Sequence, residues 1–422
     1  MNYFNTDLYE TKREIINFSK NMTKGLSKPD EKFVMDMMYG LHHSQSVLLT
    51  DISRSLEESI KLRNTVERLS DHLASFSDAS LKKIKENYYR KVIHYTDTQP
   101  LILLDNSEII KKYGKKFEDL CRVRDASSLK NDTYPGYHIC EATIVTKNEK
   151  QPISLYSHIY STESHGFKSM NDETIKSIKE VKKVITNKCT FVCDRGYDAN
   201  IFFDYFLNDD CNDEFVIRLK ETRNLLFKGK SKNVGEIVKK RKGKIKMEMY
   251  FSKENKEVYV SHTKVELPTH KGKALTLVMV YGLSEENPMM LLTNRMVSCK
   301  EDVHKIVRAY MTRWRIEENF RFKKQQYRQE NMRVRTLHAM NVMNTLLMII
   351  AGHIGILGES IDKKLLIIKI IERSKSIKGK AYLWSYQIAK GIKNILNYAH
   401  NGIKEFQEIR KQKEYKQLQL QL

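Results

Sequence analysis

The chain has 422 residues, of which 41% are apolar, and only 6 Pro and 17 Gly. This composition is typical of a globular chain of roughly two to four domains and excludes a disordered or collagen-like protein. The 74 Lys and Arg against 52 Asp and Glu give a net charge of +22, which favours a polyanionic partner. Nucleic acid fits that description better than an anionic membrane surface.

Neither end of the chain nor its apolar runs predict a membrane or a secreted location. The longest apolar stretch, Leu346 to Leu357, contains His353 and is shorter than the roughly 20 residues of a bilayer span. The N-terminus lacks a basic region followed by an apolar one, so no secretory signal is visible. Six scattered Cys without zinc-ligand spacing indicate reduced thiols. We expect no membrane partner and a cytoplasmic, nucleoid-associated protein.

Residues 1–94 are predicted to form a helical N-terminal DNA-binding domain. From Phe33 to Arg90 the apolar residues recur at helical spacing, which indicates a bundle of short helices. A helix, a turn and a second helix carrying Arg54, Arg63 and Arg68 would present basic side chains to a major groove. An all-helical packing domain with solvated charges is an equally good interpretation.

In residues 95–223 the spacing of the apolar residues changes, and short β-rich runs alternate with helical segments, as in a mixed α/β sheet. The β-rich runs are LILLD from Leu101, YHICEATIVT from Tyr137, PISLYSHIYS from Pro152, TFVCD from Thr190 and EFVIRL from Glu214. The third run is followed by DETIKSIKEVKKVI, in which the apolar residues have helical spacing. A second helix is expected after the fourth run, in DANIFFDYFL, with Asp198 as its N-cap. Strands that alternate with helices predict a sheet covered by helices.

The rest of the chain divides into a basic β-strand insertion and two helical regions. In residues 224–298, segments such as EVYVSHTKVEL and ALTLVMVYGL alternate as antiparallel strands do, and residues 221–280 hold 15 Lys and Arg against 6 acids. Residues 299–350 contain the helix discussed next. Residues 351–422 are predicted as a helical C-terminal region whose last 19 residues, KEFQEIRKQKEYKQLQLQL, fray.

The segment YMTRWRIEENFRFKKQQYR carries an unusual pattern of charge. It contains no Pro or Gly and is predicted as one helix, in which six residues share a face: Tyr310, Arg313, Glu317, Arg321, Lys324 and Arg328. A metal-binding carboxylate beside phosphate-binding cations explains all six positions. A solvated face explains them equally well, since Glu317 and Arg321 would form an i,i+4 pair that contributes only about 0.2 to 0.5 kcal/mol.

Two aspartates favour the metal-binding interpretation. Asp105 follows the apolar run Leu101 to Leu104, and Asp194 follows Thr190 to Cys193, so both are expected at or near the carboxyl ends of buried strands, where α/β proteins build sites. A helix packed across that sheet would bring Glu317 to them. Hard carboxylate ligands suit Mg²⁺, and two ions about 3.5 to 4 Å apart would activate the attacking oxygen and stabilise the leaving one.

These residues resemble a known family. Tyr310, Arg313, Glu317 and Lys324 match the Y-(2)-R-(3)-E-(6)-K signature of the IS4 family of DDE transposases, which are encoded by bacterial insertion sequences. The resemblance covers roughly residues 95–344 and includes LILLDNSEIIKKYGKKFEDL, FVCDRGYD and EFVIRLKETR.

The resemblance implies an α/β fold with an RNase H-like catalytic core in two parts, 95–223 and 299–350, interrupted by the β-strand insertion. It implies that Asp105, Asp194 and Glu317 are catalytic and bind two Mg²⁺ ions, for which Mn²⁺ substitutes. It also implies that Tyr310, Arg313 and Lys324 contact DNA phosphates.

Other basic residues are further candidates to line the DNA path: Arg321 on the same helix, and Arg218, Lys220 and Arg223 where the chain leaves the strand EFVIRL toward the insertion. For the last three, a solvated edge strand is the alternative.

We therefore expect a transposase that binds double-stranded DNA, namely terminal inverted repeats and target DNA, as a homodimer. It would cleave each end and transfer the strand. A catalytically silent DNA-binding regulator and an RNase H-like structure-specific nuclease are the alternatives. Retention of all three acids favours catalysis over the regulator.

Overall fold

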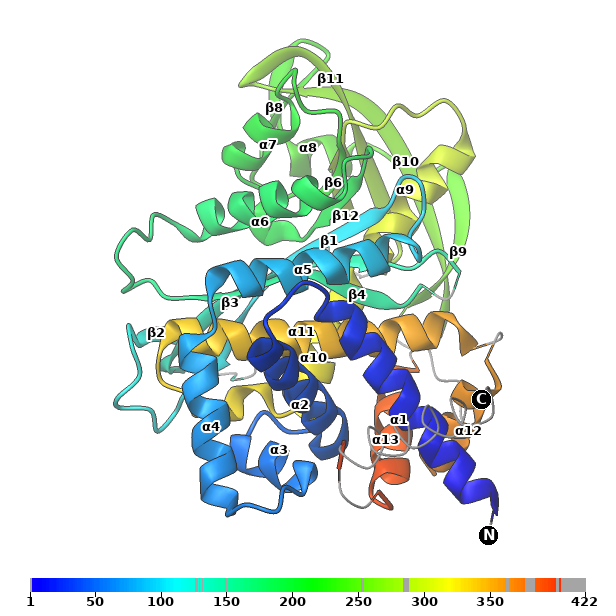
Figure 1. Cartoon of the computed structure of the whole chain (residues 1–422). Helices are drawn as coiled ribbons and strands as arrows, with labels where there is room; N and C mark the ends of the chain where they lie inside the picture. Colours follow the sequence, from blue (N-terminus) through cyan, green and yellow to red (C-terminus); the bar gives the residue numbers. More distant parts are fainter. Residues whose placement is uncertain are drawn as a thin grey trace.

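A mixed β-sheet and a layer of helices make up the protein in the computed structural model (Figure 1). The structure describes residues 2–125, 128, 130, 132–148, 150–251, 254–283, 288–361, 364–375, 384–399 and 402–403. The tail predicted to fray, residues 404–422, lies outside these ranges.

The N-terminal region is helical, as its periodicity predicts. Five helices follow one another: α1 (Asn2–Met22), α2 (Lys28–Ser44), α3 (Leu49–Leu56), α4 (Leu62–Ser75) and α5 (Asp78–Ile93). Two of them begin at a serine N-cap, since the hydroxyls of Ser27 and Ser77 accept backbone N–H groups of the first turn. Charged residues of α4 lie on the surface in ion pairs, such as Arg63 with Glu67 at 2.7 Å.

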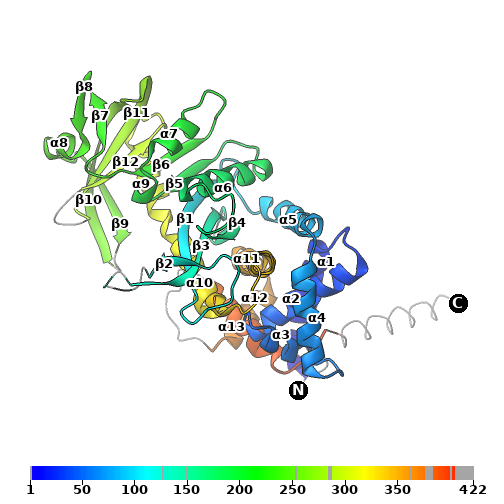
Figure 2. The ribbon, with the colours of Figure 1, turned by 90° about the vertical axis from the view of Figure 1, so that its left-hand side faces the viewer.

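The helical layer is built from both ends of the chain. Helix α11 (Leu337–Glu359) packs on α2, α4 and α5, while α13 (Ser385–Leu396) packs on α1 and α2, and on α12 (Leu365–Arg373). Figure 2 shows the N- and C-terminal helices side by side, away from the β-strands of the insertion. Helix α11 also runs continuously through residue 350, where the sequence suggested a boundary between two regions.

Helix α11 is the central helix of the core. It is long and apolar enough to cross a membrane, but 94% of its most apolar window is buried inside the protein. Gly352 leaves room for Tyr88 of α5, because a Cβ there would lie 1.8 Å from the Tyr88 hydroxyl. That hydroxyl donates to the carbonyl of Ser154 at 2.8 Å.

The core of the sheet is mixed, as predicted. Five strands lie in the order β4, β3, β1, β5, β6: β1 (Leu101–Ile110), β3 (Thr133–Val145), β4 (Pro152–Tyr160), β5 (Thr190–Cys193) and β6 (Glu214–Arg218). Strands β1, β5 and β6 are parallel, and β3 and β4 are antiparallel to their neighbours. The short strand β2 (Cys121–Arg124) pairs with β3. The predicted mixed α/β class is confirmed.

The two faces of this sheet are covered by different helices. Consecutive strand residues point to opposite faces. The side chain of Asn106 donates to Thr174 of α6 (Met170–Val184) at 3.2 Å, whereas Asp105 faces the start of α10 (Trp314–Gln326). Helix α10 packs across β1, β3 and β4. The sheet therefore holds Asp105 on the α10 side.

The basic insertion extends the same sheet rather than forming a separate one. Its strands are β7 (Asn224–Phe227), β8 (Lys230–Asn233), β9 (Ile245–Phe251), β10 (Glu254–Leu267), β11 (His270–Tyr281) and β12 (Met289–Thr293), with a short helix α8 (Val234–Lys239). Antiparallel pairing of β9, β10 and β11 is confirmed. Strand β12 joins the insertion to the core, because Leu292 pairs with Ile217 of β6.

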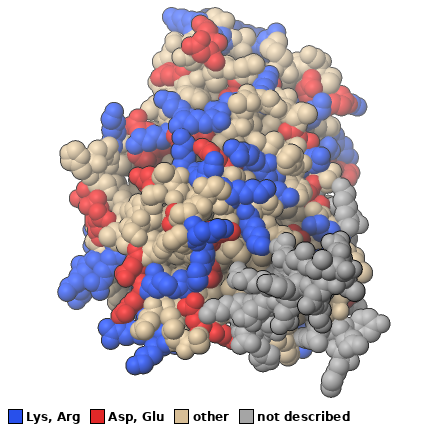
Figure 3. All heavy atoms as spheres, viewed as in Figure 1, with Lys and Arg blue, Asp and Glu red and all other residues tan. Residues whose placement is uncertain are grey.

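Two local expectations are wrong. Helix α7 (Asn200–Phe206) has Ala199 as its N-cap residue, and Asp198 does not cap it: the Asp198 carboxylate accepts the backbone N–H of Lys220 at 2.8 Å and the Nε–H of Arg223 at 2.7 Å. The second is the alternative interpretation of a solvated edge strand for Arg218, since β6 lies between β5 and β12. On the face shown in Figure 3, Lys and Arg form a band across the middle of the molecule, over α5 and α6.

Candidate active site

Asp105 and Asp194 lie side by side on parallel strands. Leu103 of β1 pairs with Val192 of β5, and two residues further along this register Asp105 comes opposite Asp194. Strand β5 stops at Cys193, whereas β1 runs on to Ile110. Asp105 is therefore not at the end of its own strand, as predicted, but at the point where its parallel neighbour ends and the sheet opens.

The segment predicted as a single helix is in fact two helices with a break at Arg313. Helix α9 (Lys300–Thr312) ends there and α10 begins, with the backbone N–H of Arg313 donating to Tyr310 and that of Ile316 donating to Arg313, both at 3.0 Å. These i to i+3 bonds are those of a tight turn rather than of an α-helix. Helix α10 then ends at Gln326, which leaves Arg328 outside it with a left-handed backbone, φ 54°.

The break brings Arg313 between two of the three predicted carboxylates. Its Nη1 lies 3.4 Å from Asp105 Oδ2, and its Nη2 donates to Glu317 Oε1 at 2.7 Å. The side chain of Arg313 is 13% exposed, and its buried Nε has no hydrogen-bond partner in the part of the chain that the structure describes. Asp194 Oδ1 accepts the backbone N–H of Gly196 at 2.6 Å. One guanidinium thus links β1 to α10 and keeps a donor free.

The carboxylates act on one another. Burial and the neighbouring Asp194 raise the pKa of Asp105 to about 7, against the opposing effect of Arg313, and Glu317 adds to the rise. Partly buried, mutually repelling carboxylates of this kind mark functional sites more often than structural ones. A bound cation would relieve this repulsion.

The raised pKa predicts how Asp105 affects the stability of the metal-free protein. The native carboxyl holds its proton up to about pH 7 and the unfolded one only to about pH 4, so stability should fall as the pH rises through that window. Replacing Asp105 by Asn should remove this component and raise the Tm above that of the wild type at pH 8. Thermal unfolding between pH 5 and 8 with a chelator measures this, and parallel curves would contradict it.

The donor set fits a divalent cation in its chemistry, but the carboxylates do not form a ready-made cage. Asp105, Asp194 and Glu317 supply the hard oxygen atoms that Mg²⁺ prefers. Within the described ranges, however, no three His, Cys, Asp or Glu side chains are close enough to hold a metal ion together. The expected convergence on one point is therefore not present, because the Arg313 guanidinium lies between Asp105 and Glu317.

The other predicted DNA-binding residues are spread around this centre. Tyr310 is buried, and burial raises the pKa of its hydroxyl, while Arg313 and Arg218 act to lower this pKa. Arg218 acts on Tyr310 partly through a side-chain hydrogen bond, so it reaches the site from β6. Lys324 lies 3.3 Å from Glu330, and Arg321 pairs with Glu318.

The trio after the strand EFVIRL does not act as one surface. Lys220 is exposed, whereas Arg223 is held 2.7 Å from the buried Asp198 and is a structural residue. Of these three basic residues, only Arg218 lies beside the acidic centre.

A buried polar network next to the site was not foreseen. Glu141 lies directly opposite Asp105 on β3 and forms an ion pair with Lys323 of α10, with both side chains fully buried. Asn319 donates to Glu141 and, at 2.7 Å, to Ser154. The only sequence signals are a Glu within the strand YHICEATIVT and a Lys beside Lys324. The network anchors the face of α10 that points away from Glu317.

Two aspartates on neighbouring strands, a glutamate on α10 and an arginine between them are the types of side chain with which enzymes that act on phosphodiesters bind cations and phosphates. A family model described as "Transposase DDE domain" matches residues 123–351, more than half of the chain. The chain therefore belongs to that family of DDE transposases and is a DNA-cleaving and strand-transferring enzyme. Asp194 and Glu317 fall within the matched residues, and Asp105 precedes them.

No curated protein sequence matches this chain. Among solved structures, the chain is similar to the cryo-EM structure of a piggyBac transposase synaptic complex with hairpin DNA. The identity is 13% and the TM-score 0.47, over 95% of this chain and 79% of that chain.

Proposed function

We propose that this transposase acts on the terminal inverted repeats of its own insertion element, with Asp105, Asp194 and Glu317 as its catalytic carboxylates. The observation that carries the proposal is the register of β1 and β5, which brings Asp105 beside Asp194, together with the Arg313 bridge from Asp105 to Glu317. The strand order β4, β3, β1, β5, β6 supports an RNase H-like core. The spacing of Tyr310, Arg313, Glu317 and Lys324 supports assignment to the IS4 family.

The three carboxylates would hold Mg²⁺ or Mn²⁺, with two ions in the complete site. When bound, these ions supply charge for the attacking and leaving oxygens of an in-line displacement at phosphorus. For the carboxylates to share a cation, Glu317 must exchange its 2.7 Å bond with Arg313 for the cation. Arg313 would then be free to donate its unpaired Nε and its Nη atoms to a phosphate of the DNA.

The remaining residues have roles in binding rather than in the reaction. Tyr310 and Arg218 would orient the phosphate beside Arg313, while Lys324, Arg321 and Lys220 would hold phosphates further from the cleavage point. The helices of residues 1–94 are the elements best shaped to read the terminal repeat in a major groove. We propose a homodimer on DNA and a cytoplasmic, nucleoid-associated location.

Cleavage products distinguish this function from its alternatives. The wild-type chain with Mg²⁺ should nick a duplex that carries the element's end and then join the new 3′ end to a second duplex. Hydrolysis without joining would indicate a structure-specific nuclease. Specific binding without hydrolysis would indicate a regulator. Inverted repeats that flank the gene would supply the substrate.

The phosphate role of Lys324 predicts a specific change in salt dependence. Replacing Lys324 by Gln should lower the slope of log affinity against log salt by about 0.9 on duplex DNA, because one phosphate contact is lost. Lys183, an exposed lysine of α6 on the opposite face of the sheet, is the matched control, since it too is paired with a glutamate. Equal slopes for K324Q and K183Q would return Lys324 to a structural role.

A further inference from the structure

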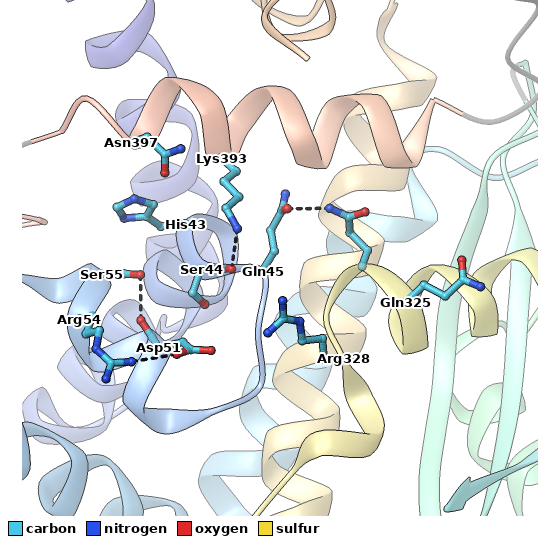
Figure 4. A pocket seen from close by; sticks show the side chains of 11 residues that line it. His43, Ser44, Gln45, Asp51, Arg54, Ser55, Gln325, Arg328, Lys393 and Asn397 are labelled. Atoms are coloured by element: carbon cyan, nitrogen blue, oxygen red, sulfur yellow. Dashed lines mark hydrogen bonds and ion pairs between the residues drawn. The ribbon is translucent and has the colours of Figure 1, made fainter. Parts of the chain in front are cut away.

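A polar pocket opens at the C-terminal end of α10, the helix that carries Glu317. It has a volume of about 520 Å³ and lies between the end of α2, helix α3, the end of α10 and helix α13. Figure 4 shows the side chains that line it, which are His43, Ser44, Gln45, Asp51, Arg54, Ser55, Gln325, Gln326, Arg328, Lys393 and Asn397. Three cations and one carboxylate make the lining basic.

Two of the three cations already have partners within the fold. Lys393 donates to the carbonyl of Ser44 at 3.2 Å, which caps the end of α2, and Arg54 donates to Asp51 at 3.1 Å. Arg328 is different. Its side chain is exposed and makes no hydrogen bond or ion pair with any residue that the structure describes.

The backbone of Arg328 is left-handed, as it is at six other non-glycine residues in the described part of the chain. Its φ of 54° is left-handed, a conformation that costs an L residue roughly 1 to 2 kcal/mol and that Gly or Asn adopts more easily at a helix end. Because the Arg328 side chain makes no hydrogen bond or ion pair in the described part of the chain, it does not offset the cost of this backbone conformation. Strain of this kind is found where function requires a particular side chain.

A second unpaired donor lies in the same pocket. Gln45 is 6% exposed and accepts from Gln326 at 2.6 Å through its Oε1, while its Nε2 is buried without a partner in the described part of the chain. A buried unpaired N–H is costly, so an acceptor that enters this pocket would be favoured. Arg328 and Gln45 together offer donors, and the excess of cations favours an anionic acceptor.

The position of the pocket relative to the acidic centre fits a DNA strand. Gln326 is nine residues beyond Glu317, which is about 13 Å along the helix, or about four base pairs of duplex, and half a turn around it, so a DNA strand that reaches both must pass around the end of α10. Lys324 lies between them on the same side of the helix as Glu317. The end of α10 is also fixed to the pocket wall, because Val47 donates its backbone N–H to the carbonyl of Tyr327 at 3.1 Å.

We propose that this pocket binds a backbone phosphate of the substrate DNA, with Arg328 as its principal ligand and Gln45 and Lys393 as additional donors. The inference rests on the proposed function and extends the DNA path beyond the acidic centre to the junction of the N- and C-terminal helices. A free phosphate or a nucleotide offers the same chemistry, so the test must separate these sources from DNA.

The test replaces Arg328 by Gly in the full-length chain and measures binding of a synthetic duplex against salt. We expect about tenfold weaker binding and a slope lower by about 0.9, with an equal or higher Tm because the left-handed backbone is relieved. K150G is the matched control, since Lys150 is also left-handed and in an exposed ion pair, at the β3–β4 turn. It should leave the slope unchanged.

Duplexes with a single neutral methylphosphonate locate the contact. Wild-type binding should weaken at one position about three to six nucleotides from the cleavage point, and R328G should not respond there. An unchanged slope in R328G overturns the proposal, as does a Tm shift by inorganic phosphate alone without an effect on DNA. Absence of cleavage by the wild type, with a lower slope still seen in R328G, would instead refute the proposed function and leave this contact standing.

Discussion

Replacing Glu317 by Gln should abolish DNA cleavage while the protein still binds its duplex. Glutamine keeps the size of the side chain but removes the charge that a divalent cation requires, and the loss should be about three orders of magnitude or more in rate. Asp105→Asn and Asp194→Asn should behave alike, because the three residues act as one ligand set. Cleavage of a labelled duplex in Mg²⁺ and in Mn²⁺ measures the effect.

The neighbouring Glu318 is the matched control for Glu317. It lies on the same helix and pairs with Arg321, away from Asp105 and Asp194. E318Q should cleave at close to the wild-type rate. If E317Q cleaved as fast as E318Q, the carboxylate of Glu317 would not belong to the site, and the 2.7 Å contact with Arg313 would be only a helix-stabilising pair.

The strands that carry Asp105 and Asp194 were predictable because unbroken apolar runs of four residues are typical of buried parallel strands. Even so, the sequence placed Asp105 at a strand end, whereas β1 continues to Ile110. The second half of β1, from Asp105 to Ile110, contains both polar and apolar residues. It pairs with β3 on one side, and β5 has already ended on the other side. A polarity pattern indicates which residues are buried, and in this half of β1 the burial depends on where the neighbouring strand β5 ends.

The break at Arg313 could not be predicted from local propensity. The segment around it has no Gly, no Pro and good helix formers, so its intrinsic preference is one continuous helix. Tertiary contacts override that preference: the turn allows Arg313 to reach Asp105 on β1 and Glu317 on α10 together. Strand β12 was missed for a related reason, since MMLLT is buried on both faces and shows no alternation.

The helical regions at the two ends of the chain were each predictable, but their association was not. Periodicity reveals that α2 and α11 have apolar faces and does not reveal that they pack on one another. Their contact includes the His42–His353 pair, with Nε2 and Nδ1 3.0 Å apart, from residues 311 positions apart in the chain. Variants that test DNA recognition by residues 1–94 are therefore best made in the full chain.

Replacing Lys323 by Met should lower the free energy of unfolding by about 3 to 5 kcal/mol, because it leaves Glu141 charged and buried without its partner. Methionine fills a similar volume, so the loss reports the charge rather than a cavity. Lys32→Met is the matched control. Lys32 pairs with Asp36 at 2.6 Å but is 53% exposed, so its loss should cost about 0 to 1 kcal/mol. Urea unfolding measures both.

The Lys323→Met substitution should also affect DNA cleavage, because α10 carries both Lys323 and Glu317. Lys323 and Asn319 hold the buried face of α10 against β3, and Glu317 projects from the other side, so a small rotation of the helix moves the carboxylate away from Asp105. K323M should therefore need more Mg²⁺ for half-maximal cleavage than the wild type.

The double variant with Glu141→Gln should regain most of the stability, because no buried charge remains. If it also regained the wild-type Mg²⁺ dependence, the pair would serve stability alone; if the dependence stayed shifted, the ion pair itself would set the position of Glu317.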